Sequence, residues 1–488
     1  MTSPRPKRPG SPSSRRPNSS NRTRTSKNDS GHKRDQQPPY QRREHPAKGR
    51  FGRAADVNRS KSRPNPDEMR TSHIYRARSI NPGSGRATFL RDADVEGTCR
   101  MKEECGGCEF VNLPYETGLA TKHRRGLRVL EDADIPGTYQ ATDPVPSPKE
   151  THYRSLFKFA VRPGRGKTFQ ADNRFAIGLF KPGTHDVVEI DHCPLHTRPL
   201  KALLADLRDE LEALHLTPYD EKTNTGDIRY LVARSAHLTG EIMLTIVVTS
   251  NLKQEMKLLL NNLKSREHHI NSCHMNINAV VGNNIFGKET IRIGGTNYLR
   301  ERICDLSFEI APTAFFQVNP WQAINLYRRV EQIAGHVNEG NVAWDLYCGS
   351  GQMALLMARA GYRVLGIEEN PASIENAINN ANRNNLANAT FIASRVEDSH
   401  ADLPEWSKKP ELIVVNPSRR GLAQETRKFL REHLAANPST RLIYVSCEIK
   451  TLARDLKELT ESGKNLKQLE SFDMFPQTDK MEWLAVIG

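Results

Sequence analysis

A cysteine at the end of an apolar run is the first residue whose position could carry chemistry. The run 442–445 predicts a buried strand, and Ser446, Cys447 and Glu448 follow it directly. Open α/β sheets bind ligands at the carboxyl ends of their strands, so Cys447 is expected at a ligand-binding edge. A thiol at that edge can act as a nucleophile, whereas a cysteine within a core only fills space.

A glycine-rich turn offers a second chemical function. The stretch DLYCGSG, residues 345–351, follows a predicted strand and opens a predicted helix. Glu368 ends the next strand, where a carboxylate can accept hydrogen bonds from both hydroxyls of a ribose. The dinucleotide fingerprint GxGxxG and the phosphate-binding GK[ST] are both missing from this stretch. S-adenosylmethionine (AdoMet) is therefore the expected ligand; the alternative is a tight turn that binds something else.

A third buried run, residues 411–415, leads into Asn416-Pro417-Ser418-Arg419. A turn of this kind directs polar groups into the site at the strand ends. Asn-Pro-Pro followed by an aromatic residue would indicate methylation of an amino group, with the aromatic ring stacked on the substrate. Arg419 stands in place of that ring, which argues against amino-group methylation.

A thiol beside a methyl donor favours covalent methylation of uracil. Carbon 5 of uracil is a poor nucleophile, but addition of a thiolate to carbon 6 creates an enolate that makes carbon 5 reactive. A base must then remove the carbon 5 proton so that the thiolate can leave. We interpret Cys447 as the nucleophile and Glu482, just before the last predicted strand, as the base. Cys348, Cys273 and Cys304 are expected to be core residues.

At this point the chain resembles the RNA uracil-5 methyltransferases of the TrmA/RlmC/RlmD type over residues 95–488. The motifs that carry the resemblance are FFQVNP (315–320), DLYCGSG (345–351), GIE (366–368), NPSRRG (416–421), YVSC (444–447) with TLARDL (451–456), and FDMFPQT with Glu482 (472–482). The resemblance implies Cys447 as nucleophile and Glu482 as proton acceptor. It also implies an AdoMet site lined by Gln317, Tyr347, Gln352, Glu368 and Asn416.

The form of the motifs is closest to the RlmC branch, which modifies large-subunit (23S) ribosomal RNA. Two positions depart from the family pattern: Ser418 replaces a second proline, and Glu448 replaces an asparagine after the nucleophile. A carboxylate at 448 could raise the pKa of the neighbouring thiol. Two alternatives therefore stay open: transfer RNA as substrate, and an inactive RNA-binding factor for ribosome assembly.

Three cysteines crowd into ten residues far from the nucleophile. Cys99, Cys105 and Cys108, with Cys193 as a distant fourth ligand, could hold zinc or an iron–sulfur cluster, and their spacing leaves this choice open. The resemblance implies a [4Fe–4S] cluster. A fourth thiolate would close that cluster to radical chemistry, so we interpret it as structural or RNA-shaping. His192 and His196, which flank the fourth cysteine, are expected to be satisfied surface histidines.

The elements that must position these residues predict two folded regions. After residue 311, strands alternate with helices, which implies a doubly wound, Rossmann-like α/β methyltransferase domain over 311–488. Between 150 and 310, alternating apolar runs broken by Gly and Pro predict antiparallel strands. We assign 86–310 to a mainly antiparallel β (α+β) region that carries the cysteines and binds RNA, with Arg154 and Lys158 on its RNA platform.

The basic charge is concentrated at the start of the chain. Residues 1–80 hold 21 Lys/Arg and 6 Asp/Glu of the 71 and 57 in the whole chain, so the remainder is nearly neutral. This composition predicts a disordered basic tail over 1–85. The tail is either a solubilising extension or an arm that binds RNA phosphates.

Composition also sets the expected compartment. No run of about 18 apolar residues is present, so no membrane span is expected. The first residues lack the apolar core of a signal peptide, and the eight cysteines do not resemble a secreted disulfide framework. We expect a cytoplasmic monomer whose partner is RNA.

Overall fold

The computed structural model describes residues 98–137, 139–164, 175–338, 340–399 and 403–488. The predicted basic tail lies outside these described residues, as does the stretch 165–174 within the predicted RNA platform. Among the described residues, no helix is long and apolar enough to cross a membrane.

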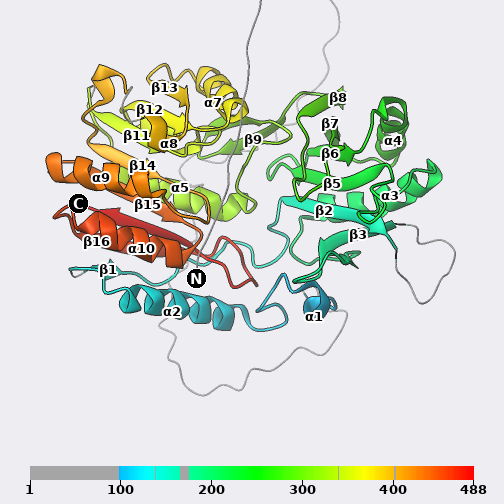
Figure 1. Cartoon of the computed structure of the whole chain (residues 1–488), viewed down its shortest axis with the longest axis horizontal. Coiled ribbons are helices and arrows are strands. Elements are labelled where there is room, and N and C mark those ends of the chain that lie inside the picture. Colours follow the sequence, from blue (N-terminus) through cyan, green and yellow to red (C-terminus); the bar gives the residue numbers. More distant parts are fainter. Residues whose placement is uncertain (1–97, 138, 165–174, 339, 400–402) are drawn as a thin grey trace, which may run out of the picture. The chain divides into compact units, whose positions relative to one another are not determined.

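An eight-stranded sheet dominates the C-terminal half (Figure 1). Its order is β1-β16-β17-β15-β14-β11-β12-β13, and β17 runs antiparallel to both of its neighbours. The strands are β1 (Gln140–Ala141), β11 (Val342–Leu346), β12 (Arg363–Glu368), β13 (Ala389–Ala393), β14 (Leu412–Val415), β15 (Arg441–Ser446), β16 (Leu466–Phe472) and β17 (Glu482–Ile487). The order reverses between β11 and β14, which confirms the predicted doubly wound domain and marks the usual ligand crevice.

Helices cover both faces of this sheet, because its central strands are apolar on both sides. One buried cluster joins the sheet to α5 (Pro320–Ala334), α6 (Gln352–Arg359) and α7 (Pro371–Arg383). A second cluster joins it to α9 (Gln424–Ala436) and α10 (Ile449–Thr460), with the short α8 (Val396–Ser399) nearby. The strand ends between these layers stay free for a ligand.

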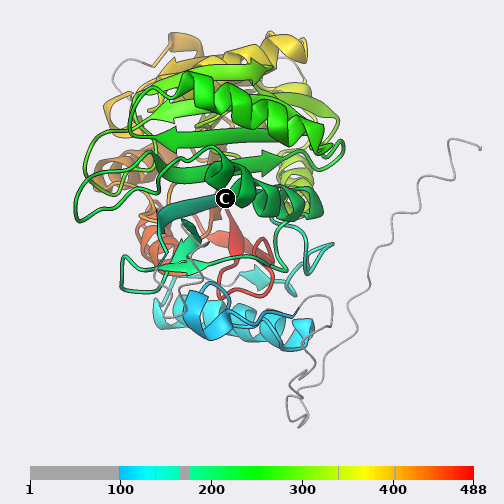
Figure 2. The same ribbon diagram turned by 90° about the vertical axis from the view of Figure 1, so that its right-hand side faces the viewer.

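A second, seven-stranded sheet has the order β4-β3-β2-β5-β6-β7-β8 and is antiparallel except for the β6–β7 pair. Its elements are β2 (Leu156–Pro163), β3 (Phe175–Phe180), β4 (Val187–Glu189), β5 (Ile228–Ser235), β6 (Ile242–Val248), β7 (Ile270–Ile277), β8 (Glu289–Gly295), α3 (Arg198–Ala213) and α4 (Lys253–Ser265). Both helices pack on the same face, as Figure 2 shows. The hairpin β9 (Leu299–Ile303)–β10 (Leu306–Ile310) follows.

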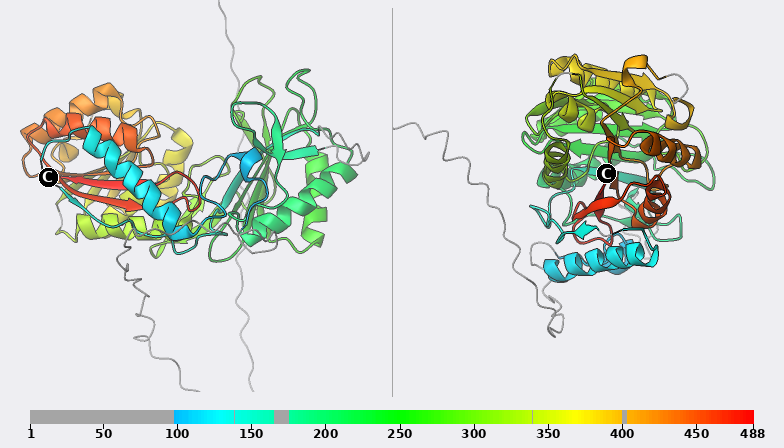
Figure 3. Two further views of the ribbon diagram at one scale, coloured as in Figure 1. Left: turned by 90° about the horizontal axis from the view of Figure 1, so that it is seen from below. Right: turned by 90° about the vertical axis from the view of Figure 1, so that its left-hand side faces the viewer.

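The first described segment is shared between the two sheets, because Met101 and Cys105 pack against the core of the seven-stranded sheet and residues 115–141 lie with the C-terminal sheet. It holds α1 (Lys102–Cys105) and α2 (Tyr115–Asp132), and then β1, which pairs with β16. Figure 3 shows α2 crossing the C-terminal strands, where it packs against α10. The approach is close at Gly126, since a Cβ built there would lie 2.0 Å from the Trp483 ring. The boundaries predicted at residues 85 and 310 stay predictions.

Candidate active site

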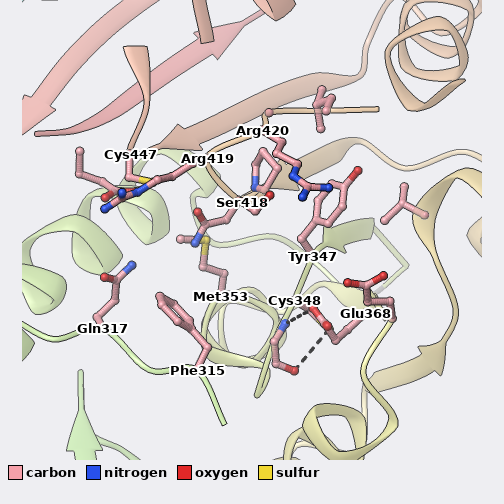
Figure 4. Close-up of a pocket in the computed structure, with 18 of the residues that line it drawn as sticks. Phe315, Gln317, Tyr347, Cys348, Met353, Glu368, Ser418, Arg419, Arg420 and Cys447 are labelled. Carbon is pink, nitrogen blue, oxygen red and sulfur yellow. Dashed lines mark hydrogen bonds between the residues drawn. The ribbon is translucent and has the colours of Figure 1, made fainter. Parts of the chain in front are cut away.

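One cavity of about 1340 Å³ lies at the carboxyl ends of the C-terminal strands. Its walls bring together all seven residues predicted for AdoMet binding and catalysis, namely Gln317, Tyr347, Gln352, Glu368, Asn416, Cys447 and Glu482. These residues come from positions up to 165 apart in the sequence, and Figure 4 draws many of them around the same space. The strand-end placement inferred for the nucleophile and the turn is therefore confirmed.

The glycine-rich turn has a backbone shape that few sequences allow. Tyr347, Gly349 and Gly351 all have positive φ angles, of 66°, 55° and 86°. Such angles are nearly free for glycine and unfavourable for other residues. A Cβ on Gly349 would meet nothing closer than 3.9 Å, so this side of the turn faces open space. The Glu368 carboxylate accepts the Gly349 N–H at 3.3 Å.

This turn fits AdoMet by its polar groups as well as by its shape. Asp345 is fully buried beside the cavity; its Oδ2 accepts the Ala354 N–H at 2.7 Å, while its Oδ1 has no hydrogen-bond partner among the described residues. Burial raises the pKa of Asp345 to about 7. An unpaired buried oxygen is unfavourable unless a ligand or water satisfies it. Together with the Glu368 carboxylate it offers acceptors to a nucleoside.

The nucleophile sits beside a cation. Cys447 is half-buried directly after β15, and Figure 4 shows Arg419 next to it. Burial raises the pKa of the Cys447 thiol, and the Glu482 carboxylate raises it further. The Arg419 guanidinium opposes both effects through its charge and a hydrogen bond to the thiol. Arg419 is therefore placed to stabilise the thiolate form that attacks carbon.

The predicted base has the environment that a base of this kind needs. Glu482 opens β17 and is only 2% exposed. Burial raises its pKa to about 8, and Arg419 partly counteracts that shift. A carboxyl with a pKa near the working pH can take and return a proton, which an ordinary surface glutamate does poorly.

The structure corrects the expectation for Glu448. Its carboxylate caps α10 by accepting the Lys450 N–H at 3.4 Å and pairs with the Lys480 ammonium at 3.9 Å. The carboxylate with the largest effect on the Cys447 thiol is Glu482, not Glu448. Glu448, which replaces the asparagine of the family pattern, therefore serves as the N-cap of α10.

The four predicted metal ligands are near one another but are not in ligand geometry. Burial and then the thiols of Cys193, Cys99 and Cys105 raise the pKa of Cys108 to about 12. Across the described ranges, no group of three or more His, Cys, Asp or Glu side chains is arranged to hold a metal ion. The prediction of a surface histidine is wrong for His196, which is buried at the edges of two phenylalanine rings.

Several wall residues were not predicted as site residues. Phe315 is 66% exposed although it is a large aromatic side chain, and it lines the cavity beside Gln317. Arg420, Arg427 and Arg454 also line the cavity, where Arg427 pairs with Glu458 and Arg454 pairs with Asp455. The double arginine of NPSRRG was the available signal for Arg419 and Arg420, whereas Arg427 and Arg454 lie on helices that sequence spacing does not relate to the cavity. Arg154, predicted on the RNA platform, also lines this cavity.

Comparison with known proteins identifies the family of this chain. The family model described as tRNA (Uracil-5-)-methyltransferase matches residues 137–487. Uncharacterized RNA methyltransferases of Enterococcus faecalis and Lactococcus lactis are each 32% identical, over 77% and 78% of this chain and 79% and 80% of their own lengths. A crystal structure of Pyrococcus abyssi tRNA (uracil-54, C5)-methyltransferase in complex with S-adenosyl-L-homocysteine superposes with a TM-score of 0.61 and 26% identity, covering 77% of this chain and 84% of that one. The chain belongs to the RNA uracil-5 methyltransferases, the enzymes that use AdoMet to methylate carbon 5 of uracil in RNA.

Proposed function

We propose that this enzyme methylates a uridine of 23S ribosomal RNA through a covalent adduct between Cys447 and carbon 6 of the base. The observation that carries the proposal is the meeting of a thiol, a guanidinium and a carboxyl with raised pKa in one cavity with the AdoMet turn. The NPSRRG form of the motif, which is closest to the RlmC branch, supports ribosomal RNA as the substrate.

The reaction follows from these side chains. The Cys447 thiolate adds to carbon 6 and pushes the electron pair of the 5,6 double bond toward carbon 4 and its oxygen. Arg419 stabilises the thiolate before the attack. The 345–351 turn and Glu368 would hold AdoMet, whose methyl group would pass to carbon 5 as its sulfur–methyl bond breaks and S-adenosylhomocysteine leaves. Glu482 then takes the proton from carbon 5, the double bond re-forms, and the thiolate leaves.

RNA must present a single base to this cavity, because carbon 5 is inaccessible within a stacked helix. Phe315, exposed at the cavity wall, offers a ring on which a flipped base can stack. Arg154, Arg419 and Arg420 supply positive charge for the flanking phosphates. Lys158 on β2, exposed with its ammonium over the Phe286 ring, extends this surface onto the second sheet.

Transfer RNA is the second candidate substrate, because the Pyrococcus abyssi enzyme that superposes with a TM-score of 0.61 is a tRNA (uracil-54, C5)-methyltransferase. The two candidate substrates are distinguished by incubating the protein with AdoMet and either purified 23S ribosomal RNA or bulk transfer RNA. Both RNAs must lack 5-methyluridine. Methyl incorporation into the ribosomal RNA at a rate at least tenfold above that into transfer RNA supports the proposal; the reverse preference overturns it.

We further propose that Cys99, Cys105, Cys108 and Cys193 hold a [4Fe–4S] cluster that shapes the RNA-binding region. Two observations support this proposal. The other three thiols are close enough to Cys108 to raise its pKa. Gly107, which lies between Cys105 and Cys108, lines the substrate cavity. Anaerobic purification followed by metal and sulfide analysis tests the assignment. About four iron and four sulfide per chain is the expected result, while stoichiometric zinc without iron would contradict it.

The covalent mechanism is tested with RNA fragments that contain 5-fluorouridine. Fluorine cannot leave as a cation, so the adduct with Cys447 should persist through denaturing electrophoresis when AdoMet is present. The Cys447→Ala variant should give no adduct, and Cys273→Ala, a buried cysteine of the second sheet, should react like the unaltered protein. No adduct with any RNA, despite AdoMet binding, would favour an inactive RNA-binding factor.

The basic tail is proposed to be an RNA-binding arm. Deletion of residues 1–85 should weaken RNA affinity at low salt and leave turnover at saturating RNA within about twofold, because phosphate contacts outside the cavity add affinity without chemistry. Unchanged affinity at low salt would leave the tail as a solubilising extension.

A further inference from the structure

The loop that precedes the proposed base is held by an unusual set of contacts. Residues 473–481, here called the hairpin loop, join the last residue of β16 to Glu482, the first residue of β17. Phe475, Thr478 and Lys480 of this loop line the substrate cavity. The loop therefore forms a wall of the site and also leads directly into the base.

The backbone carbonyl oxygens of the hairpin loop accept hydrogen bonds from residues outside the loop. Such a bond is made by each carbonyl from 474 to 478 and by that of 480. The donors, in order along the loop, are the Asn319 amide at 3.2 Å, the Lys122 ammonium at 3.2 Å, the Tyr153 hydroxyl at 2.9 Å, the Phe110 N–H at 2.9 Å, and the Lys122 ammonium again at 3.4 and 3.1 Å. An irregular loop is thereby given one defined backbone path.

Lys122 is the centre of this arrangement. Its ammonium donates to the Asp473 carboxylate at 2.5 Å and to three loop carbonyls, and the residue is only 4% exposed. Asp473 is fully buried, and its Oδ2 has no hydrogen-bond partner among the described residues. A buried lysine is retained only where its charge is well satisfied, and here the loop wraps around that charge. Lys122 thus specifies the loop conformation.

Four of the six hydrogen bonds to these carbonyls come from a part of the chain that the family match does not include. That match begins at residue 137, whereas Phe110 and Lys122 precede it. Phe110 also follows Cys108 by two residues, so the cysteine segment and the hairpin loop are directly joined.

We propose that Lys122 is a positioning residue for the proton-abstraction step, acting through the hairpin loop on Glu482. This inference deepens the proposed function and rests on its covalent mechanism. Cys447 and the AdoMet turn are positioned by other strands, so loosening the loop should leave addition and methyl transfer in place. Removal of the carbon 5 proton, and with it release of the methylated RNA, should slow.

The test follows a natural uridine RNA with radiolabelled AdoMet methyl groups in a single turnover. In the Lys122→Met variant, methyl label should accumulate in a denaturant-stable protein–RNA adduct, and release of free methylated RNA should slow at least tenfold. The Glu482→Gln variant should show the same signature more strongly. AdoMet affinity should stay within about twofold of the unaltered protein. Lys457→Met is the matched control, because Lys457 donates to the Ala133 carbonyl and does not touch the loop.

The possible failures are distinguishable. If the unaltered protein forms no adduct with 5-fluorouridine RNA, the proposed covalent mechanism fails. If it forms one, Glu482→Gln accumulates labelled adduct, and Lys122→Met releases product at the normal rate, then the positioning role of Lys122 is wrong. Should Lys122→Met not fold, Lys122→Arg and Tyr153→Phe are measured instead. The arginine retains the charge, and the phenylalanine removes one bond to the loop. Slower release in either supports the proposal, and normal release in both overturns it.

Discussion

The two walls of the cavity are built in different ways. The strand-end wall, made of the 345–351 turn, Glu368, Asn416 and Cys447, follows directly from β11, β12, β14 and β15, so the ladder of the parallel sheet fixes its backbone. The hairpin loop has no ladder, and hydrogen bonds from the Phe110 backbone and from the side chains of Lys122, Tyr153 and Asn319 fix it instead. The first wall is local and the second depends on distant parts of the chain.

This difference divides the chemistry between the walls. The nucleophile and the methyl-donor site belong to the wall that the sheet supports, whereas the base stands where the hairpin loop meets β17. A change in distant packing should therefore disturb proton removal before it disturbs attack on the base or AdoMet binding. Substitutions in the two walls should therefore affect different steps of the reaction.

The largest expected effect is on the base. Glu482→Gln should reduce turnover by about 10²–10⁴-fold, the usual contribution of a general base. The rate of adduct formation with 5-fluorouridine RNA should fall much less, because addition uses the strand-end wall. Steady-state methylation and gel-shift rates measure the two. Equal losses in both would mean that Glu482 serves the attack as well, and the division between the walls would be wrong.

The contrast between the walls also explains what the sequence could predict. Cys447, Glu368 and the 345–351 turn were predictable because each lies at the carboxyl end of an apolar strand, and strand ends of one sheet meet at one edge. The hairpin loop gave no such signal, since Lys122 lies 351 residues from Asp473 and looks like one of several basic residues on an amphipathic helix. The placement of α2 on the C-terminal sheet was missed for the same reason.

Burial of Glu482 should make stability depend on pH. With a pKa raised from 4.5 to about 8, the folded state keeps a proton that the unfolded chain loses above pH 4.5. The contribution of this group to the free energy of unfolding is therefore full below pH 4.5 and declines as the pH rises through 8. Urea unfolding at pH 5 and pH 8.5 measures it.

The matched comparison uses Glu482→Gln, which cannot titrate. Between these two pH values the unaltered protein should lose a few kcal/mol relative to this variant. Glu425→Gln, at an exposed position of α9, should track the unaltered protein at both. A pH-independent difference between the unaltered protein and Glu482→Gln would mean that the carboxyl does not titrate in this range.

On the strand-end wall, Glu368→Ala should weaken AdoMet binding by about 10–100-fold, as expected for loss of hydrogen bonds to a charged acceptor. Calorimetry measures the affinity, and Glu375→Gln, exposed on α7 nearby, is the control. Affinity for RNA in the absence of AdoMet should stay unchanged. A variant that loses RNA and AdoMet together would indicate that this wall is not independent of the rest of the cavity.

Gly126→Ala tests the support of the hairpin loop at a distance. The added Cβ would overlap the Trp483 ring of β17, so α2 must shift away from the sheet. We expect about 1–3 kcal/mol of lost stability, although alanine favours a helix by about 1 kcal/mol over glycine. Release of methylated RNA should slow more than AdoMet binding weakens. Arg124→Ala, exposed on the same helix, should change stability by no more than about 0.5 kcal/mol. A stable Gly126→Ala protein with normal release would show that α2 can move without disturbing the loop.

The smallest effect is expected where the two walls touch, at the Glu448–Lys480 pair. Glu448→Asn should keep the cap on α10, because asparagine is as good an N-cap as an acidic residue, and it removes an ion pair that is partly exposed and 3.9 Å long. Turnover should stay within about twofold, and the pH dependence of adduct formation should not move, because Glu482 and Arg419 are the charges that act most on the Cys447 thiol. Arg419→Met is the informative contrast, since loss of that guanidinium should shift the same pH profile upward. If the pH profile of adduct formation shifted downward by half a pH unit or more in Glu448→Asn, Glu448 would be a carboxylate that raises the pKa of the Cys447 thiol. The two walls would then be coupled through the nucleophile.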